Sequence, residues 1–134
     1  MIALDTNILV RSALDDDSAL CAHAQRLILR NQCHVSILAV AEMGYVLMSF
    51  YGVKKSALII SCRGLIGQPN VECEHEQRVL LALEGVEAGI DWFDALLWAS
   101  TPLTGTLVTY DKPFAKRAAA RGWLVECRLP KMGK

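Results

Sequence analysis

The stretch Ile2-Ala3-Leu4-Asp5 opens the chain with a short apolar run that ends in an acid. A run this short and this apolar is typical of a strand buried in a parallel sheet. The pattern returns at Thr106-Leu107-Val108-Thr109, where Asp111 follows two residues later. Because ligands gather at the carboxyl ends of parallel strands, both acids are expected to open onto the same edge. The alternative for either acid alone is that it caps the following helix.

Outward from these two strands, apolar periodicity predicts that short strands alternate with helices. The expected strands cover 2–4, 33–36, 71–73, 106–109 and 123–126, and the expected helices cover 19–30, 38–51, 54–65, 74–88, 92–101 and 112–121. The cluster Asp15-Asp16-Asp17-Ser18 is expected to cap the helix from Ala19, and Gly122 to end the helix from Lys112. This alternation predicts an α/β sandwich around a parallel sheet.

Length and composition favour one globular domain over residues 1–134. Hydrophobic residues make up 53% of the 134 and charged residues 21%, which is too apolar for intrinsic disorder. The longest apolar stretch, Ile37–Met48, contains Glu42 and is too short for a membrane span. The first residues lack the basic start and apolar run that are typical of a secretory signal. The cysteines are odd in number, scattered and without a CxxC pair: Cys21, Cys33, Cys62, Cys73 and Cys127. A reduced, cytoplasmic protein is expected.

Charge is balanced overall but divided unevenly along the chain. There are 14 basic and 14 acidic residues, so the total gives no argument for nucleic-acid binding. Residues 1–110 hold seven basic and twelve acidic residues, whereas 111–134 hold seven basic and two acidic residues. The last basic residues belong to an expected basic tail at 127–134. Several basic side chains next to Asp111 have helical spacing and are candidates for RNA phosphate contacts: Lys112, Lys116, Arg117 and Arg121. A solvated helix face is the alternative.

Three further acids occupy apolar surroundings. Glu42 has Leu38, Ala39, Tyr45 and Val46 at helical spacing, so it is expected to be drawn inward, where it needs a metal, donors or an arginine partner. Asp91 is favoured as an N-cap, which places Asp94 at the third helical position. The alternative for Asp94 is a first-turn acid stabilised by the helix dipole.

The acids Asp5, Glu42, Asp94 and Asp111 come from four separate elements. Carboxylates that converge repel each other unless a divalent cation lies between them. A set without His or Cys selects a hard ion such as Mg²⁺, with Mn²⁺ as a substitute. This is the chemistry of metal-assisted phosphodiester cleavage.

Four motifs follow one another along the chain: Leu4-Asp5-Thr6-Asn7, Ser36-Ile37-Leu38-Ala39-Val40-Ala41-Glu42, Gly89-Ile90-Asp91-Trp92-Phe93-Asp94-Ala95-Leu96 and Thr109-Tyr110-Asp111. Their order and spacing resemble those of the PIN-domain ribonucleases, and the length is similar to that of the VapC toxins of type II toxin-antitoxin systems. The resemblance covers Ile2 to about Val125. Leu97-Trp98 stand where relatives often have His or another polar residue, and the position of Asp111 is the most variable of the four.

The resemblance implies a PIN-like three-layer sandwich with a central, mostly parallel sheet of four to five strands. It implies an Mg²⁺-dependent endoribonuclease toxin that forms a homodimer and is inhibited by a cognate antitoxin, through which it reaches DNA only indirectly. Asp5 and Asp94 are expected as inner metal ligands, with Glu42 and Asp111 binding directly or through water. Asn7, Asp91 and Thr109 are expected as auxiliary residues.

Two other functions remain as alternatives. One is a non-catalytic PIN-like subunit that binds an antitoxin and DNA in transcriptional autoregulation. The other is a phosphoacceptor domain, which also places acids at strand ends. It needs an acidic neighbour for Asp5, and the sequence has none.

Overall fold

The chain folds into two compact units, Met1–Glu76 and Gln77–Lys134, which are considered one at a time. The structure is a computed structural model, and it describes residues 1–14, 16–123 and 125–131. Within these ranges, no helix has the length and apolarity that crossing a membrane requires.

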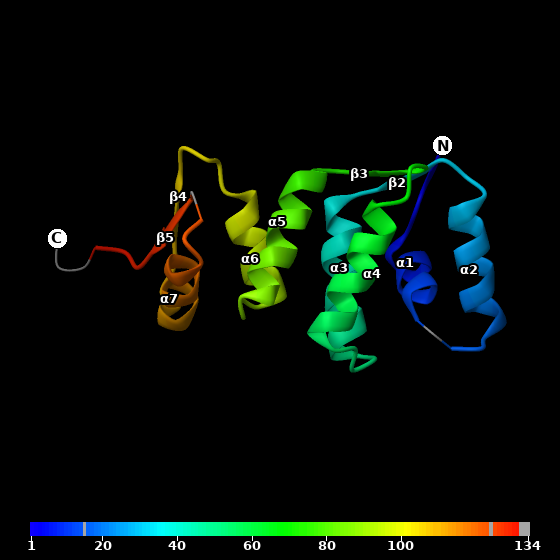
Figure 1. The fold of residues 1–134 in the computed structure, drawn as a ribbon, viewed down its shortest axis with the longest axis horizontal. Coiled ribbons are helices and arrows are strands. Elements are labelled where there is room, and N and C mark those ends of the chain that lie inside the picture. The colour runs from blue at the N-terminus through cyan, green and yellow to red at the C-terminus, as the bar shows by residue number, and fades with distance from the viewer. Residues whose placement is uncertain (15, 124, 132–134) are drawn as a thin grey trace. The chain divides into compact units, whose positions relative to one another are not determined.

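The first unit is built on a parallel sheet of three short strands. Figure 1 labels the second and third of them. In spatial order these are β1 (Ile2–Ala3), β2 (Cys33–Val35) and β3 (Val71–Cys73). Parallel neighbours require a crossover, and here each crossover is a pair of helices. The pairs are α1 (Thr6–Ala13) with α2 (Ala19–Leu29), and α3 (Ile37–Ser49) with α4 (Lys55–Ile66). Cys33 aligns with Ile2 on one side and with Val71 on the other, which fixes the register.

Helix caps and a dry core hold the first unit together. The hydroxyl of Ser18 accepts a hydrogen bond from the Cys21 amide at 3.2 Å, and that of Ser36 accepts one from the Ala39 amide at 3.1 Å. Helix α1 packs on both α2 and α3. Side chains of several elements are fully buried between these helices and the sheet: Leu9, Val35, Met43, Leu47 and Leu58. Each contributes about 1.5–3 kcal/mol by burial.

The second unit contains three helices and a parallel strand pair. Helix α5 (Glu76–Glu87) leads into it, followed by α6 (Trp92–Ser100), β4 (Thr106–Val108), α7 (Lys112–Arg121) and β5 (Glu126–Arg128). Helix α7 is the crossover between β4 and β5. Gly122 ends α7 in the left-handed region at φ 70°, where a side chain is strained.

Trp98 is the centre of the core of the second unit. Its side chain is 2% exposed, and its indole N–H donates to the Val125 carbonyl at 2.9 Å. Trp123 packs edge-on against it with ring centroids 4.3 Å apart. The α6 helix approaches α5 closely, because Gly85 lies against Ala95 without a side chain between them.

The expected α/β architecture with parallel strands is confirmed, and the described strands form a three-stranded and a two-stranded sheet. The strand expected at 123–126 is displaced, because β5 covers Glu126–Arg128, and Leu124 of the expected range lies outside the described residues. The carbonyl of Val125, just before β5, accepts the hydrogen bond of the Trp98 indole. Periodicity also failed to define α1, which is only 8 residues long.

Two further expectations fall partly or wholly outside the described residues. The expected tail at 127–134 begins inside β5, and its residues 132–134 are not described. In the expected cap cluster, Asp15 is not described, while Ser18 is the N-cap of α2.

Candidate metal centre

Asp94 and Asp111 lie on one cavity of the second unit. Asp94 is the third residue of α6, where the turn that buries Trp92 and Ala95 leaves it half-buried. Asp111 is the N-cap of α7, one short turn after β4 ends. The cavity has a volume of about 220 Å³ and is lined by Ile90, Asp91, Asp94, Asp111, Pro113, Phe114 and Arg117. Two of the four predicted metal ligands and one auxiliary acid are thus neighbours.

The surroundings of Asp94 disfavour the ionised form of its carboxyl group. Partial burial is the largest effect that raises the pKa of this carboxyl, and the negative charges of Asp111 and Asp91 raise it further. A divalent cation in the cavity would reverse this penalty, because it attracts the ionised form that the neighbouring acids repel. The electrostatics of the site therefore fit a cation.

Cys127 is a neighbour of these acids that the sequence did not single out. Burial is the main cause that raises the pKa of its thiol, followed by the charges of Asp94 and Asp111. The thiol therefore stays protonated at neutral pH. The acids that line the cavity supply carboxylate oxygens, which suit Mg²⁺ or Mn²⁺ better than zinc. Cys127 reaches this position because β5 pairs with β4, and the sequence has no local signal for such a long-range contact.

Asp111 is held in place by two hydrogen bonds. Its Oδ1 accepts from the Phe114 amide at 3.0 Å, so the capping alternative is confirmed for this acid. Its own amide donates to the hydroxyl of Thr109 at 3.0 Å. Capping occupies only one carboxylate oxygen, and Oδ2 makes no hydrogen bond to any described residue. Capping and cation binding are therefore compatible.

Asp91 occupies the N-cap position of α6, as expected, but without a side-chain capping bond. Its backbone carbonyl accepts from the Ala95 amide at 2.8 Å, which begins the helix. Asp91 is also among the residues that line the cavity. Asp91 thus adds negative charge beside Asp94.

Asp5 and Asn7 lie in the first unit, at the start of α1. Asp5 follows β1 and caps α1, and its Oδ1 accepts from the Thr6 amide at 2.7 Å. The side chains of both Asp5 and Asn7 are exposed. Asp5 follows β1 after one intervening residue, Leu4, and the capping alternative is confirmed for this acid too.

Glu42 is exposed on α3 in the first unit, so the expectation that it is drawn inward is wrong there. Two of the four apolar neighbours that suggested burial are themselves open, with Leu38 67% and Tyr45 47% exposed. Helix α3 is apolar on nearly every side, and its buried face is the one that carries Val40, Met43 and Leu47. In such a helix, apolar neighbours do not define the inner face.

Within either unit, the described residues contain no group of three or more His, Cys, Asp or Glu side chains able to hold a metal ion. Asp91, Asp94 and Asp111 share a cavity without forming such a group. The second unit supplies a partial oxygen donor set.

The four basic side chains of α7 differ in their surroundings. Arg121 forms an ion pair with Glu84 at 3.2 Å. Lys112 and Lys116 are exposed and do not line the acidic cavity. Arg117 does line it, one turn after Pro113 and Phe114 on the same helix face.

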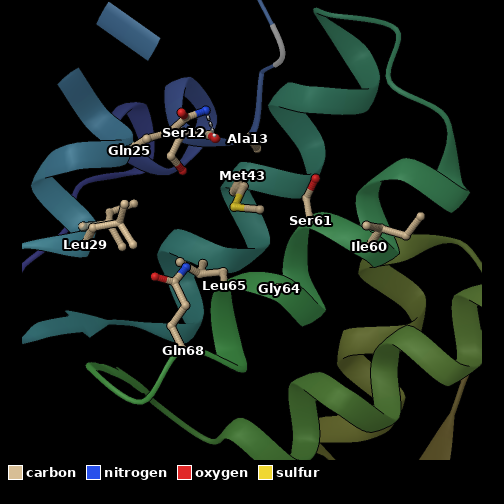
Figure 2. Close-up of a pocket in the computed structure, with 11 residues that line it drawn as sticks. Ser12, Ala13, Gln25, Leu29, Met43, Ile60, Ser61, Gly64, Leu65 and Gln68 are labelled. Atoms are coloured by element: carbon tan, nitrogen blue, oxygen red, sulfur yellow. Dashed lines mark hydrogen bonds between the residues drawn. The ribbon is translucent and has the colours of Figure 1, made fainter. Parts of the chain in front are cut away.

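A larger cavity in the first unit lacks the chemistry of a metal site. It has a volume of about 410 Å³ and opens between α1, α2, α3 and α4 (Figure 2). Gln25 bridges two of these helices by donating to the Ser12 carbonyl at 3.2 Å. The described residues that line the cavity include apolar, hydroxyl and amide side chains but no ionisable group. It therefore offers no carboxylate to a metal ion.

Comparison with known proteins identifies the family. The PIN domain family matches residues 2–120, so the chain belongs to the PIN domain family. PIN domains are generally metal-dependent nucleases, and PIN-domain nucleases act on RNA. No curated protein matches the sequence.

Proposed function

We propose that this chain is an Mg²⁺-dependent endoribonuclease in which Asp5, Glu42, Asp94 and Asp111 bind the ion. Mn²⁺ is the expected substitute, because carboxylate oxygens suit both ions. The observation that carries the proposal is the cavity that Asp94 shares with Asp111 and Asp91, in a chain of a nuclease family. Mutual repulsion among these carboxylates makes a divalent cation the natural occupant.

When bound, the ion lowers the pKa of a water and neutralises charge that develops on the phosphate. The chain's own residues orient this chemistry. Asp111 is fixed by the Phe114 amide, and Thr109 holds the turn before it. Asp94 projects from the first turn of α6, and a helix holds a side chain in place more precisely than a loop does. Asn7 and Asp91 are proposed to assist at the edge of the site.

RNA binding is proposed for the basic residues of α7: Lys112, Lys116, Arg117 and Arg121. They follow the cavity acid Asp111 directly in the chain, so their charges can attract phosphates toward the acids. Arg121 is the weakest of them, because Glu84 already neutralises it.

The decisive experiment is cleavage of defined single-stranded RNAs in Mg²⁺ or EDTA. Asp5→Asn and Asp94→Asn should each reduce cleavage more than about a hundredfold, because metal catalysis supplies several kcal/mol. EDTA should abolish the activity of the wild type. Asp17→Asn, at an exposed acid before α2, is the matched control and should cleave like the wild type. Cleavage that persists in Asp94→Asn, or that EDTA leaves intact, contradicts the proposal.

The cellular role that we propose is that of a homodimeric, cytoplasmic toxin of a type II toxin-antitoxin system, inhibited by a cognate antitoxin. Family membership and an RNA-directed activity support this role. Induced expression should arrest growth, and a small protein encoded beside this chain should restore it. Growth that continues with active wild-type protein contradicts the toxin role. An arrest that Asp5→Asn also produces favours a non-catalytic binding subunit.

A further inference from the structure

Arg117 combines two features that the other basic residues of α7 do not. It is on the wall of the acidic cavity with Asp94 and Asp111. Within the described part of the chain, its guanidinium also makes no ion pair or hydrogen bond, although three carboxylates line the same cavity. Arg121 on the same helix, in contrast, is paired with Glu84.

The positive charge of Arg117 reduces the repulsion between the acids of the cavity and an RNA phosphate. A phosphodiester is negative, and Asp91, Asp94 and Asp111 repel it from the cavity. A divalent ion offsets part of this charge, and an arginine on the wall offsets more. The planar guanidinium also presents two parallel N–H donors, which match two phosphate oxygens.

Helix α7 sets the position of Arg117 relative to the acid. Asp111 caps the helix, and Pro113, Phe114 and Arg117 follow at spacings that place them on one face. Phe114 is buried and anchors that face in the core. Lys116 and Arg117 are both exposed, but Lys116 precedes Arg117 by one residue, so it projects about 100° away around the helix and does not line the cavity.

We propose that Arg117 binds the non-bridging oxygens of the scissile phosphodiester and positions it against Asp94 and Asp111. This inference rests on the proposed nuclease function and separates Arg117 from the three other basic residues of α7. Lys112, Lys116 and Arg121 then contribute only general attraction for RNA.

The experiment compares Arg117→Gln with Lys116→Gln, which removes the same charge one residue away. Binding of a fluorescent single-stranded RNA is measured in EDTA at several salt concentrations. Arg117→Gln should weaken binding by about ten- to a hundredfold, the range for a lost hydrogen bond to a charged group. It should also lower the salt slope by about 0.7, the value for one phosphate contact on a single strand. Lys116→Gln removes only general attraction for RNA and should weaken binding less than Arg117→Gln, by under about threefold, as expected for one exposed charge.

Cleavage in Mg²⁺ supplies the second measurement. Arg117→Gln should lower kcat/KM at least as much as it lowers affinity, and Arg117→Lys should restore the salt slope but only part of kcat/KM, since lysine lacks the planar fork. Circular dichroism of each variant checks that α7 is intact.

The outcomes separate the inference from the proposed function. If wild type cleaves RNA but Arg117→Gln and Lys116→Gln behave alike, the role of Arg117 is wrong and the nuclease function stands. If wild type binds RNA through Arg117 without cleaving it, the inference is supported for binding and the nuclease function fails. If wild type does not bind RNA, both are overturned.

Discussion

The carboxyl of Asp94 links the stability of the fold to the chemistry of the site. Burial, Asp111 and Asp91 all raise its pKa. The folded chain therefore holds the proton of this acid at a pH where the unfolded chain has released it. Stability from this group is complete below the ordinary value of 3.8 and is lost as the pH rises through the raised value.

Asp94→Asn removes this penalty at neutral pH. In EDTA we expect the variant to unfold at higher urea concentration than the wild type at pH 7, and the difference should disappear below pH 3.8. Urea denaturation at a series of pH values measures it. A variant less stable than the wild type at pH 7 contradicts the repulsion between Asp94 and its neighbours.

Asp16→Asn serves as a control of opposite sign. Hydrogen bonding to Cys21 and Ser18 lowers the pKa of Asp16 to about 2. The stability that this acid contributes is present above 3.8 and is lost as the pH falls toward 2. Asp16→Asn should therefore be less stable than the wild type at pH 7, and the gap should close in acid.

Individual site residues were predictable to different degrees. Asp5 and Asp111 were recognisable because each follows an apolar strand, and that local pattern agrees with the structure. The exposure of Glu42 was not predictable, because α3 is apolar all round and the pattern does not show which face is covered. The sequence also could not show that Arg117 lines the acidic cavity, because all four basic residues of α7 have helical spacing.

At the scale of elements, α7 was predicted with its bounds because every signal for it is local. Asp111 caps it, Pro113 occupies its first turn and Gly122 ends it. Strand β5 was misplaced because its start depends on a bond between Trp98 and Val125, which are far apart in the sequence. Local chemistry therefore located helix ends, and tertiary contacts decided the strand.

The contact between α5 and α6 makes a testable element-scale prediction. A Cβ at Gly85 would lie 3.3 Å from the Cβ of Ala95 and 3.8 Å from the Trp98 ring. Gly85→Leu should therefore destabilise the fold by about 1–3 kcal/mol, the usual cost of overpacking. Since α6 carries Asp94, cleavage should fall too.

Gly64→Leu is the matched control for this substitution. Gly64 is also inside a helix, but a Cβ there meets nothing within 4 Å. Replacement should be neutral or stabilising by up to about 1 kcal/mol, because glycine is a poor helix former. Urea denaturation of both variants checks the pair. Equal effects at the two positions contradict the close approach of α5 and α6.

At the scale of the whole molecule, the account depends on acids from distant parts of the sequence. Asp94 and Asp111 share a cavity of the second unit, and Asp5 and Glu42 belong to the first. The sequence predicted four carboxylates on one ion from motif order. Asp94 and Asp111 line one cavity of the second unit. The binding of one ion by Asp5 and Asp94 together is a proposal, which a measurement of metal affinity can test.

The most direct measurement is a double-mutant cycle of Mn²⁺ affinity by calorimetry with wild type, Asp5→Asn, Asp94→Asn and the double variant. If both carboxylates bind one ion, each single substitution should weaken binding at least about tenfold, or 1.4 kcal/mol. The double variant should then be little weaker than either single one, with an interaction energy above about 1 kcal/mol. Losses that simply add, or an Asp5→Asn variant with wild-type affinity, contradict a shared metal site.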